Sequence, residues 1–117
     1  MYNSFEKLEV WKRACTIAVS IYDTFTNCRD YSLKDQMSRA AVSIASNIAE
    51  GAERDSPKEY IRFLHIAKGS AAELRTQIYI SCRIGIITID KQKELTEELK
   101  VISKMLQSLI KSIKPKT

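Results

Sequence analysis

The sequence predicts an all-α protein, an antiparallel up-down-up-down four-helix bundle in which residues 1–117 form one domain. The first observation is composition: only 3 Gly and 2 Pro occur in 117 residues, so long helices are expected. The second is periodicity, because apolar residues recur at steps of three and four and never in sustained alternation. The third is connection length, because helices joined by only a few residues pack antiparallel to their neighbours.

The first helix is predicted over residues 5–27. Apolar residues three and four positions apart share one face of a helix. One such stripe is assigned to the core: Leu8, Trp11, Cys15, Ala18, Tyr22 and Phe25. A second apolar stripe lies to one side of it: Val10, Ala14, Ile17 and Ile21.

The second helix is predicted over residues 33–50. Ser32 is the expected N-cap, with Asp35 in the first turn where an acidic residue is favourable. Its apolar stripe consists of Leu33, Met37, Ala40, Ile44 and Ile48. Gly51 is expected to end the helix in the left-handed conformation.

The third helix is predicted over residues 57–84. Ser56 and Glu59 form a capping box around Pro57, which suits the first helical position. Gly85 ends the helix. The expected core stripe is Tyr60, Leu64, Ala67, Ala71, Leu74, Ile78 and Cys82.

The fourth helix is predicted over residues 89–113, with Thr88 or Asp90 as its cap. Its apolar residues alternate four and three positions apart, which is a heptad seam of the kind that packs in bundles. The seam consists of Leu95, Leu99, Ile102, Leu106, Leu109 and Ile113. Residues 114–117 form a basic tail.

The chain carries more apolar surface than one bundle needs. The extra residues indicate either a broad core stripe or a subunit interface. We favour the interface, because Gly69 lies inside a helix and such a glycine often marks the close approach of another backbone. The predicted interface residues are Val10, Ile17, Ile66, Gly69 and Ile80.

A polar set lies on one face of the second helix: Arg39, Ser43, Asn47 and Glu50. The set indicates either hydrogen bonds to neighbouring helices or a binding surface. We favour the structural role, because partly buried polar groups are normally paired.

No catalytic, cofactor or metal site is predicted. His65 is the single histidine and has Arg62 three positions before it, so the Glu-x-x-His motif of di-iron bundles is absent. The three cysteines, Cys15, Cys28 and Cys82, form no closely spaced pair. No phosphate-loop or hydrolase motif occurs, and no small-molecule substrate is expected. No apolar run long enough to span a membrane and no signal peptide is found, so the cytoplasm is expected.

The net charge of +5 and a pI of about 9.2 favour a polyanionic partner. The alternative is an ordinary solvated surface. The residues predicted to contact nucleic acid are Arg54, Lys58, Arg62, Lys111, Lys114 and Lys116. Since no aromatic residues interleave with these charges, contacts to phosphates are expected, not to bases.

Two segments make the chain resemble the bacterial 23S rRNA intervening-sequence proteins, also called the S23 ribosomal protein family. They are SRAAVSIASNIAEG, residues 38–51, and EYIRFLHIAKGSAAELRTQ, residues 59–77. The resemblance implies a four-helix bundle that assembles into a homopentameric ring. The accessory proteins of diversity-generating retroelements are a related group with a similar fold. The resemblance to them implies nucleic acid and a reverse transcriptase as partners. The chain departs from the family pattern at Ala45, where proline is frequent.

The function expected from the sequence is that of a non-enzymatic, ring-forming bundle that binds RNA, including ribosomal RNA, or nucleoprotein through diffuse basic surface. The alternative is a protein–protein adaptor that docks a partner's helix without nucleic acid.

Overall fold

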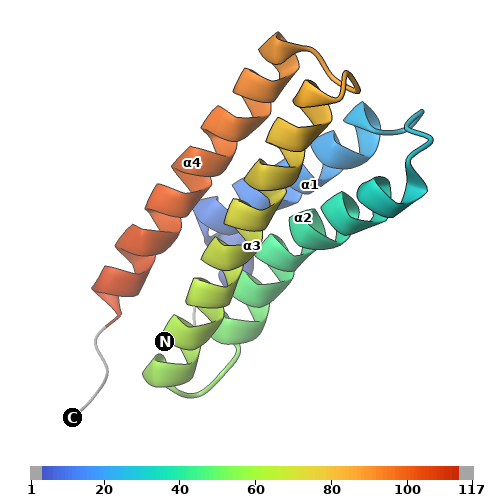
Figure 1. Cartoon of the computed structure of the whole chain (residues 1–117). Coiled ribbons are helices and arrows are strands. Elements are labelled where there is room, and N and C mark those ends of the chain that lie inside the picture. Colours follow the sequence, from blue (N-terminus) through green and yellow to red (C-terminus); the bar gives the residue numbers. More distant parts are fainter. Residues whose placement is uncertain (1–3, 114–117) are drawn as a thin grey trace.

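The computed structural model describes residues 4–113 and consists of helices joined by short connections. A 3-10 turn, η1 (Phe5–Lys7), precedes four α-helices. These are α1 (Glu9–Thr24), α2 (Tyr31–Ala52), α3 (Pro57–Arg83) and α4 (Ile89–Ser112). Each helix runs antiparallel to the one before it, and the bundle is a rod of 50 × 20 × 20 Å (Figure 1). Within the described part there is no strand, and the predicted all-α class is confirmed.

The predicted helix ends around α3 and α4 agree with the structure. Ser56 is the N-cap of α3, and its Oγ accepts a hydrogen bond of 3.2 Å from the Glu59 amide. Gly85 follows α3 with φ of 85°, a conformation in which glycine is favoured. Thr88, and not Asp90, caps α4 by accepting a bond from the Lys91 amide.

Two predicted boundaries differ from the structure. The first helix breaks at Leu8, whose backbone is extended, so η1 and α1 replace one helix over residues 5–27. The second begins at Tyr31, because the Asp30 side chain accepts from the Leu33 amide at 3.1 Å. Asp30 is therefore the N-cap in place of Ser32, and carboxylates and hydroxyls are both favoured there.

The prediction for Gly51 is wrong. Gly51 lies within α2 and lacks a positive φ. A Cβ atom at this position would lie 2.7 Å from the Cβ of Phe63 on α3. Gly51 is therefore needed for the close approach of α2 and α3, and not for a left-handed helix end.

The core face of α1 also differs from the predicted one, and of the predicted stripe only Phe25 is fully buried. The stripe expected to reach a subunit interface is the buried one: Val10, Ala14, Ile17 and Ile21. Val10 and Ile17 are 4% and 3% exposed within a single chain, so neither is available to a second subunit. Trp11, Cys15 and Ala18 are only half-buried, and Tyr22 is exposed. Pairing with both α2 and α4 rotates α1 so that its branched aliphatic stripe enters the core.

The other three helices bury most of the predicted stripes. Leu95, Leu99, Ile102 and Leu106 of α4 are at most 1% exposed. Beyond them Ile110 is buried where Leu109 was expected, and Leu109 packs at the core margin. On α3 the core includes Phe63, which the predicted stripe omits, in addition to Leu64 and Ile78.

Candidate nucleic-acid interface

The predicted basic end joins the start of α3 to the end of α4. The antiparallel pairing of these helices brings Lys58 and Lys111 to the same end of the rod, and both side chains are exposed (Figure 1). Lys114 and Lys116, which were also predicted for this site, lie outside the described residues.

The two arginines of this predicted site are held by acidic neighbours. Arg54 forms an ion pair of 3.2 Å with Glu50, and Arg62 one of 3.1 Å with Glu59. Both guanidinium groups also lie over the Phe63 ring, 4.9 and 4.6 Å from its centroid. The hydrogen bond from Arg62 lowers the pKa of Glu59, with smaller contributions from nearby cations. Local carboxylates therefore offset part of the charge predicted to attract phosphates.

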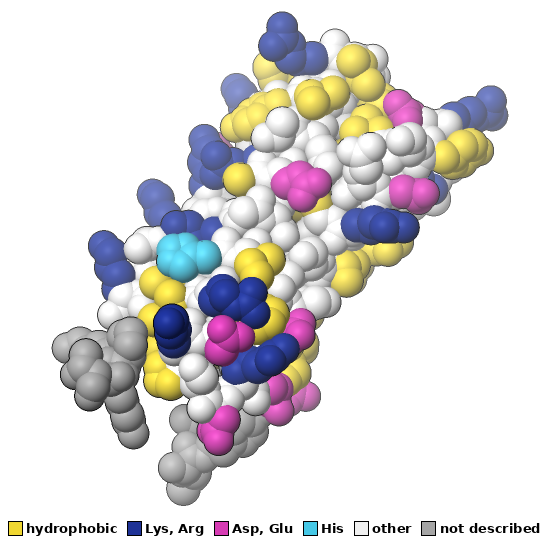
Figure 2. Space-filling view, turned by 60° about the horizontal axis from the view of Figure 1, so that its bottom comes forward, with side chains coloured by type: hydrophobic (Ala, Val, Ile, Leu, Met, Phe, Trp, Pro, Cys, Tyr) yellow, Lys and Arg dark blue, Asp and Glu magenta, His cyan; other side chains and the backbone are white. Residues whose placement is uncertain are grey.

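A larger basic surface runs along the outer side of α3 and α4. Lys68 on α3 donates a 2.6 Å hydrogen bond to Gln107 on α4, which fixes how the two helices face each other. Cations that lie close to a whole number of helical turns from this contact are on the same side. We name the set the α3–α4 basic stripe: Lys58, Lys68, Arg75, Arg83, Lys93, Lys100, Lys104 and Lys111. Figure 2 shows a row of Lys and Arg side chains along the long edge of the molecule that α4 forms.

None of the five ion pairs found between residues 4 and 113 involves a member of this stripe. The pairing of Lys68 with Gln107 places Arg75 at the height of Lys100, and Arg83 at the height of Lys93. The buried Nε atom of Arg75 has no hydrogen-bond partner. Like charges that face each other repel, and an anion bound between them relieves the repulsion. Glu97, which is exposed on the same side of α4 between Lys93 and Lys100, offsets part of this charge.

The stripe has a signal in the sequence that the predicted site did not use. No Asp or Glu follows Glu98, whereas Lys100, Lys104 and Lys111 recur at spacings of four and seven. Such spacing places them on one side of a helix. Assigning that side to α3 needed the orientation of α4, which the three-dimensional structure supplies.

Of the polar set on α2, one residue forms a hydrogen bond to another helix. The Ser70 hydroxyl on α3 donates to Ser43 Oγ at 3.0 Å, and Asn47 donates to Ser43 at 2.8 Å. Glu50 instead forms an ion pair with Arg54, which lies four residues later in the sequence. Arg39 is exposed. The interhelical bond therefore belongs to Ser43.

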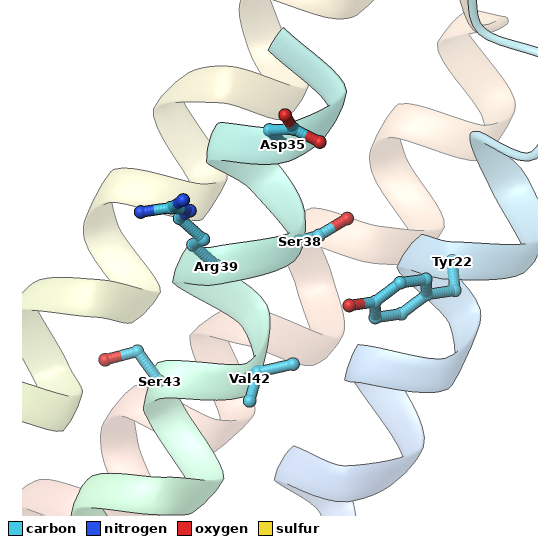
Figure 3. Close-up of a pocket in the computed structure, with 6 residues that line it drawn as sticks. All are labelled: Tyr22, Asp35, Ser38, Arg39, Val42 and Ser43. Carbon is cyan, nitrogen blue, oxygen red and sulfur yellow. The ribbon is translucent and has the colours of Figure 1, made fainter. Parts of the chain in front are cut away.

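Two hollows lie along the outer side of α1 and α2, the first lined mostly by apolar side chains and the second mostly by polar ones. The first, of about 440 Å³, is lined by Phe5, Trp11, Cys15, Ala18, Val42, Ala45, Ser46 and Ala49. Val42 also borders a second hollow of about 470 Å³, where Tyr22 of α1 faces Ser38 of α2 (Figure 3). In that view Arg39 extends to the other side of α2, toward α3. We name the two hollows together the α1–α2 groove.

The predicted interface residues on α3 remain on the surface. Ile66 and Ile80 are 40% and 46% exposed, and nothing lies within 4 Å of a Cβ atom built on Gly69. In a single chain, Gly69 therefore makes no close helix contact. Its predicted role in self-association stays a prediction.

Among residues 4–113 there is no group of three or more His, Cys, Asp or Glu side chains that could hold a metal ion. The same residues include no helix long and apolar enough to cross a membrane. His65 is exposed on α3.

Comparison with known proteins identifies the family. The family model described as 23S rRNA-intervening sequence protein matches residues 6–108. The chain belongs to this family. A solved structure from Bacteroides thetaiotaomicron VPI-5482, described as a protein with unknown function from the S23 ribosomal protein family, is similar to it. The two are 27% identical with a TM-score of 0.82, over 87% of this chain and 98% of the other. A search of curated proteins found no match.

The solved structure supports the four-helix arrangement of the intervening-sequence protein. The resemblance predicted from residues 38–51 and 59–77 is confirmed. Neither description states an enzymatic activity.

Proposed function

We propose that this intervening-sequence protein binds the phosphate backbone of RNA as a self-associating, non-enzymatic bundle. The observation that carries the proposal is the α3–α4 basic stripe, whose cations form no ion pair among the described residues. Lys93 and Lys111 are 18 residues apart on one helix, which corresponds to about 27 Å. A stripe of this length faces several consecutive phosphates of one strand, since these follow each other every few ångströms.

The stripe supports binding without base recognition. Contacts to phosphates position a protein on nucleic acid, whereas sequence is distinguished by contacts to base edges. Among the described residues, Tyr79 is the one partly exposed aromatic residue beside the stripe. One aromatic ring is too few to form a stacking platform for bases. Ribosomal RNA is the first probe because the family is named after it. A complex of a reverse transcriptase with its RNA, the partner implied by the resemblance to retroelement accessory proteins, is the second. The proposal places this binding in the cytoplasm.

The test is a charge-reversal pair with a matched control. K100E/K104E reverses two cations of the stripe, and K7E/K12E makes the same change in net charge on η1 and α1. All four lysines are exposed. We expect K100E/K104E to weaken binding of structured ribosomal RNA at low salt at least tenfold, and K7E/K12E to weaken it much less. Equal weakening would mean that only net charge matters and would overturn the assignment to the stripe.

The second candidate function is an adaptor that docks a partner protein's helix, and the α1–α2 groove favours it. The apolar part of this groove, beside Trp11 and Ala45, is a surface of the kind that accepts an amphipathic helix. If the wild-type protein retains no structured RNA at low salt, the RNA proposal fails and the adaptor function replaces it.

A further inference from the structure

We infer that Tyr79, which lies within the α3–α4 basic stripe, stacks on one unpaired base of the bound RNA. The protein then prefers single-stranded or looped RNA to a duplex. The inference rests on the proposed function and deepens it, because it names the class of RNA that the stripe binds. Contacts to phosphates carry no information about the bases, whereas an accessible aromatic ring responds to whether a base is free.

On α3, Tyr79 lies midway between two arginines. Arg75 comes four residues before it and Arg83 four residues after it, so the three side chains lie on one side of the helix. With a rise of about 1.5 Å per residue, each arginine lies about 6 Å from Tyr79 along the helix axis. A cation, a ring and a second cation therefore follow one another along the stripe.

On α4, two lysines lie close to the height of Tyr79. The hydrogen bond that fixes how α3 and α4 face each other places Thr96 level with Tyr79, and Lys93 and Lys100 within about one turn of that level. Thr96 is buried, and both lysines are exposed. The carboxylate of Glu97 is also at this height, but Glu97 lies farther round α4 from α3 than either lysine. The surroundings of Tyr79 are therefore mainly cationic.

The side chain of Tyr79 has no partner in the single chain. Tyr79 is 36% exposed, although it lies on the side of α3 toward α4. Among residues 4–113, no other ring and no cation stacks on it, and its hydroxyl forms no hydrogen bond. Part of the ring is therefore open to a ligand.

The start of the same helix shows the opposite arrangement. There the guanidinium groups of Arg54 and Arg62 lie 4.9 and 4.6 Å from the centroid of the Phe63 ring, and both form ion pairs with glutamates. Around Tyr79, within the described part of the chain, neither neighbouring arginine forms an ion pair or covers the ring. The cations and the ring are satisfied at one end of α3 and are left for a ligand toward the other.

A nucleotide in a single strand matches this arrangement, because it joins a flat base to phosphates on both sides. Bases stack on aromatic rings with little regard to sequence, and guanidinium groups donate pairs of parallel hydrogen bonds to phosphate oxygens. In a duplex the bases are paired and stacked between their neighbours, whereas loops, bulges and single strands leave a base face free. One ring is too few for a run of bases but sufficient for one.

The first test removes the ring. Y79L keeps an apolar side chain of good helix propensity, and the matched control is Y31L. Tyr31 is 68% exposed and lies on α2, diagonally opposite α4 in the bundle. The probes are a short oligouridylate, an abasic oligomer of the same length and a short RNA duplex. We expect Y79L to weaken binding of the oligouridylate by about fivefold or more, and to leave binding of the abasic oligomer and the duplex unchanged. Y31L should leave all three unchanged.

The second test keeps an aromatic ring and observes it directly. Y79F and Y79W should bind the oligouridylate as the wild type does. The wild type has one tryptophan, Trp11 on α1, so Y79W adds a second fluorophore within the stripe. We expect the oligouridylate to quench the fluorescence of Y79W and the abasic oligomer to leave it unchanged. The fluorescence of the wild type should change with neither.

The third test separates the ring from its cations. Stacking releases no counterion, so Y79L should lower the affinity without changing the slope of log K against log salt. R83Q removes a phosphate contact. It should therefore lower that slope by about 0.7 and weaken binding of the abasic oligomer as well.

The outcomes separate the inference from the proposed function. Equal weakening of all three probes by Y79L would mean that the ring only supports helix packing, and no weakening of any would mean that the stripe binds phosphates alone. Either result overturns the inference and leaves the proposed function intact if K100E/K104E acts as expected. If Y79L acts on the oligouridylate alone while K100E/K104E weakens binding no more than K7E/K12E, the Tyr79 site stands and the assignment to the whole stripe fails. A wild type that retains no RNA at low salt overturns both.

Discussion

At the scale of single residues, two helical glycines have opposite environments. Gly51 faces the Cβ atom of Phe63 and the Tyr60 backbone, whereas Gly69 faces open space. Alanine is favoured over glycine in a helix by about 1 kcal/mol. Steric overlap at Gly51 exceeds that gain, since overpacking of a core contact costs about 1–3 kcal/mol.

We therefore expect G51A to lower the free energy of unfolding by about 1–2 kcal/mol, despite its better helix propensity. G69A, compared at a concentration where both proteins are monomeric, should raise it by up to about 1 kcal/mol. Urea unfolding followed by circular dichroism measures both. An unchanged or increased stability of G51A would show that α2 and α3 are not in close contact there.

The ion pair of Glu59 with Arg62 predicts a pH dependence. The hydrogen bond from Arg62 is the main cause of the lowered pKa of Glu59. Since this pKa is lower in the folded than in the unfolded chain, the stabilisation is present above the ordinary glutamate pKa of about 4.3. It is lost as the pH falls through the folded value.

E59Q keeps the size of the side chain and removes its titration. We expect thermal stability of the wild type to fall more steeply than that of E59Q as the pH is lowered below about 5. A steeper fall in thermal stability for E59Q than for the wild type would contradict a lowered pKa of Glu59 in the folded chain.

At the scale of elements, the sequence predicts which segments are helical better than which side of each is buried. Ser56, Gly85 and Thr88 act locally, and the helix ends that they mark were predicted correctly. The buried side of α1 depends on two other helices. Both stripes of α1 are apolar. The stripe that contains the aromatic residues Trp11 and Tyr22 was predicted to be buried, but it lies on the outer side. Only the packing with α2 and α4 distinguishes them.

The two stripes of α1 predict unequal effects of truncation. I17A removes a side chain that is 3% exposed and should cost about 2–5 kcal/mol of unfolding free energy. Tyr22 is 52% exposed, so Y22A should cost less than about 1 kcal/mol. Chemical denaturation of the monomeric proteins compares them, and a larger loss for Y22A would restore the face predicted from the sequence.

At the scale of the whole molecule, charge could be counted from the sequence, but its distribution could not. Arg54 and Arg62 are positively charged, as the predicted site requires, but they form ion pairs with Glu50 and Glu59. The cations of the stripe are far apart in the sequence and meet only because α3 and α4 are antiparallel. For this reason the candidate site lies along the long side of the rod, whereas the site predicted from the sequence lies at one end.

Salt dependence tests this distribution. Each lost phosphate contact lowers the slope of log K against log salt by about 0.7–0.9. K100E/K104E should therefore reduce the slope by about 1.4–1.8 and weaken binding similarly for unrelated RNA sequences. Titrations at several salt concentrations measure the slope, and a strong change in sequence preference would indicate base contacts instead.

The close approach of α2 and α3 at Gly51 also has a kinetic consequence. The two helices are joined by a connection of four residues, 53–56, so their contact closes a short loop, which costs little chain entropy. Contacts between neighbouring segments form early in folding. We expect the α2–α3 hairpin to be structured in the transition state, so that G51A mainly slows folding. I17A, in a helix that joins later, should mainly speed unfolding. Stopped-flow measurements separate the two rates.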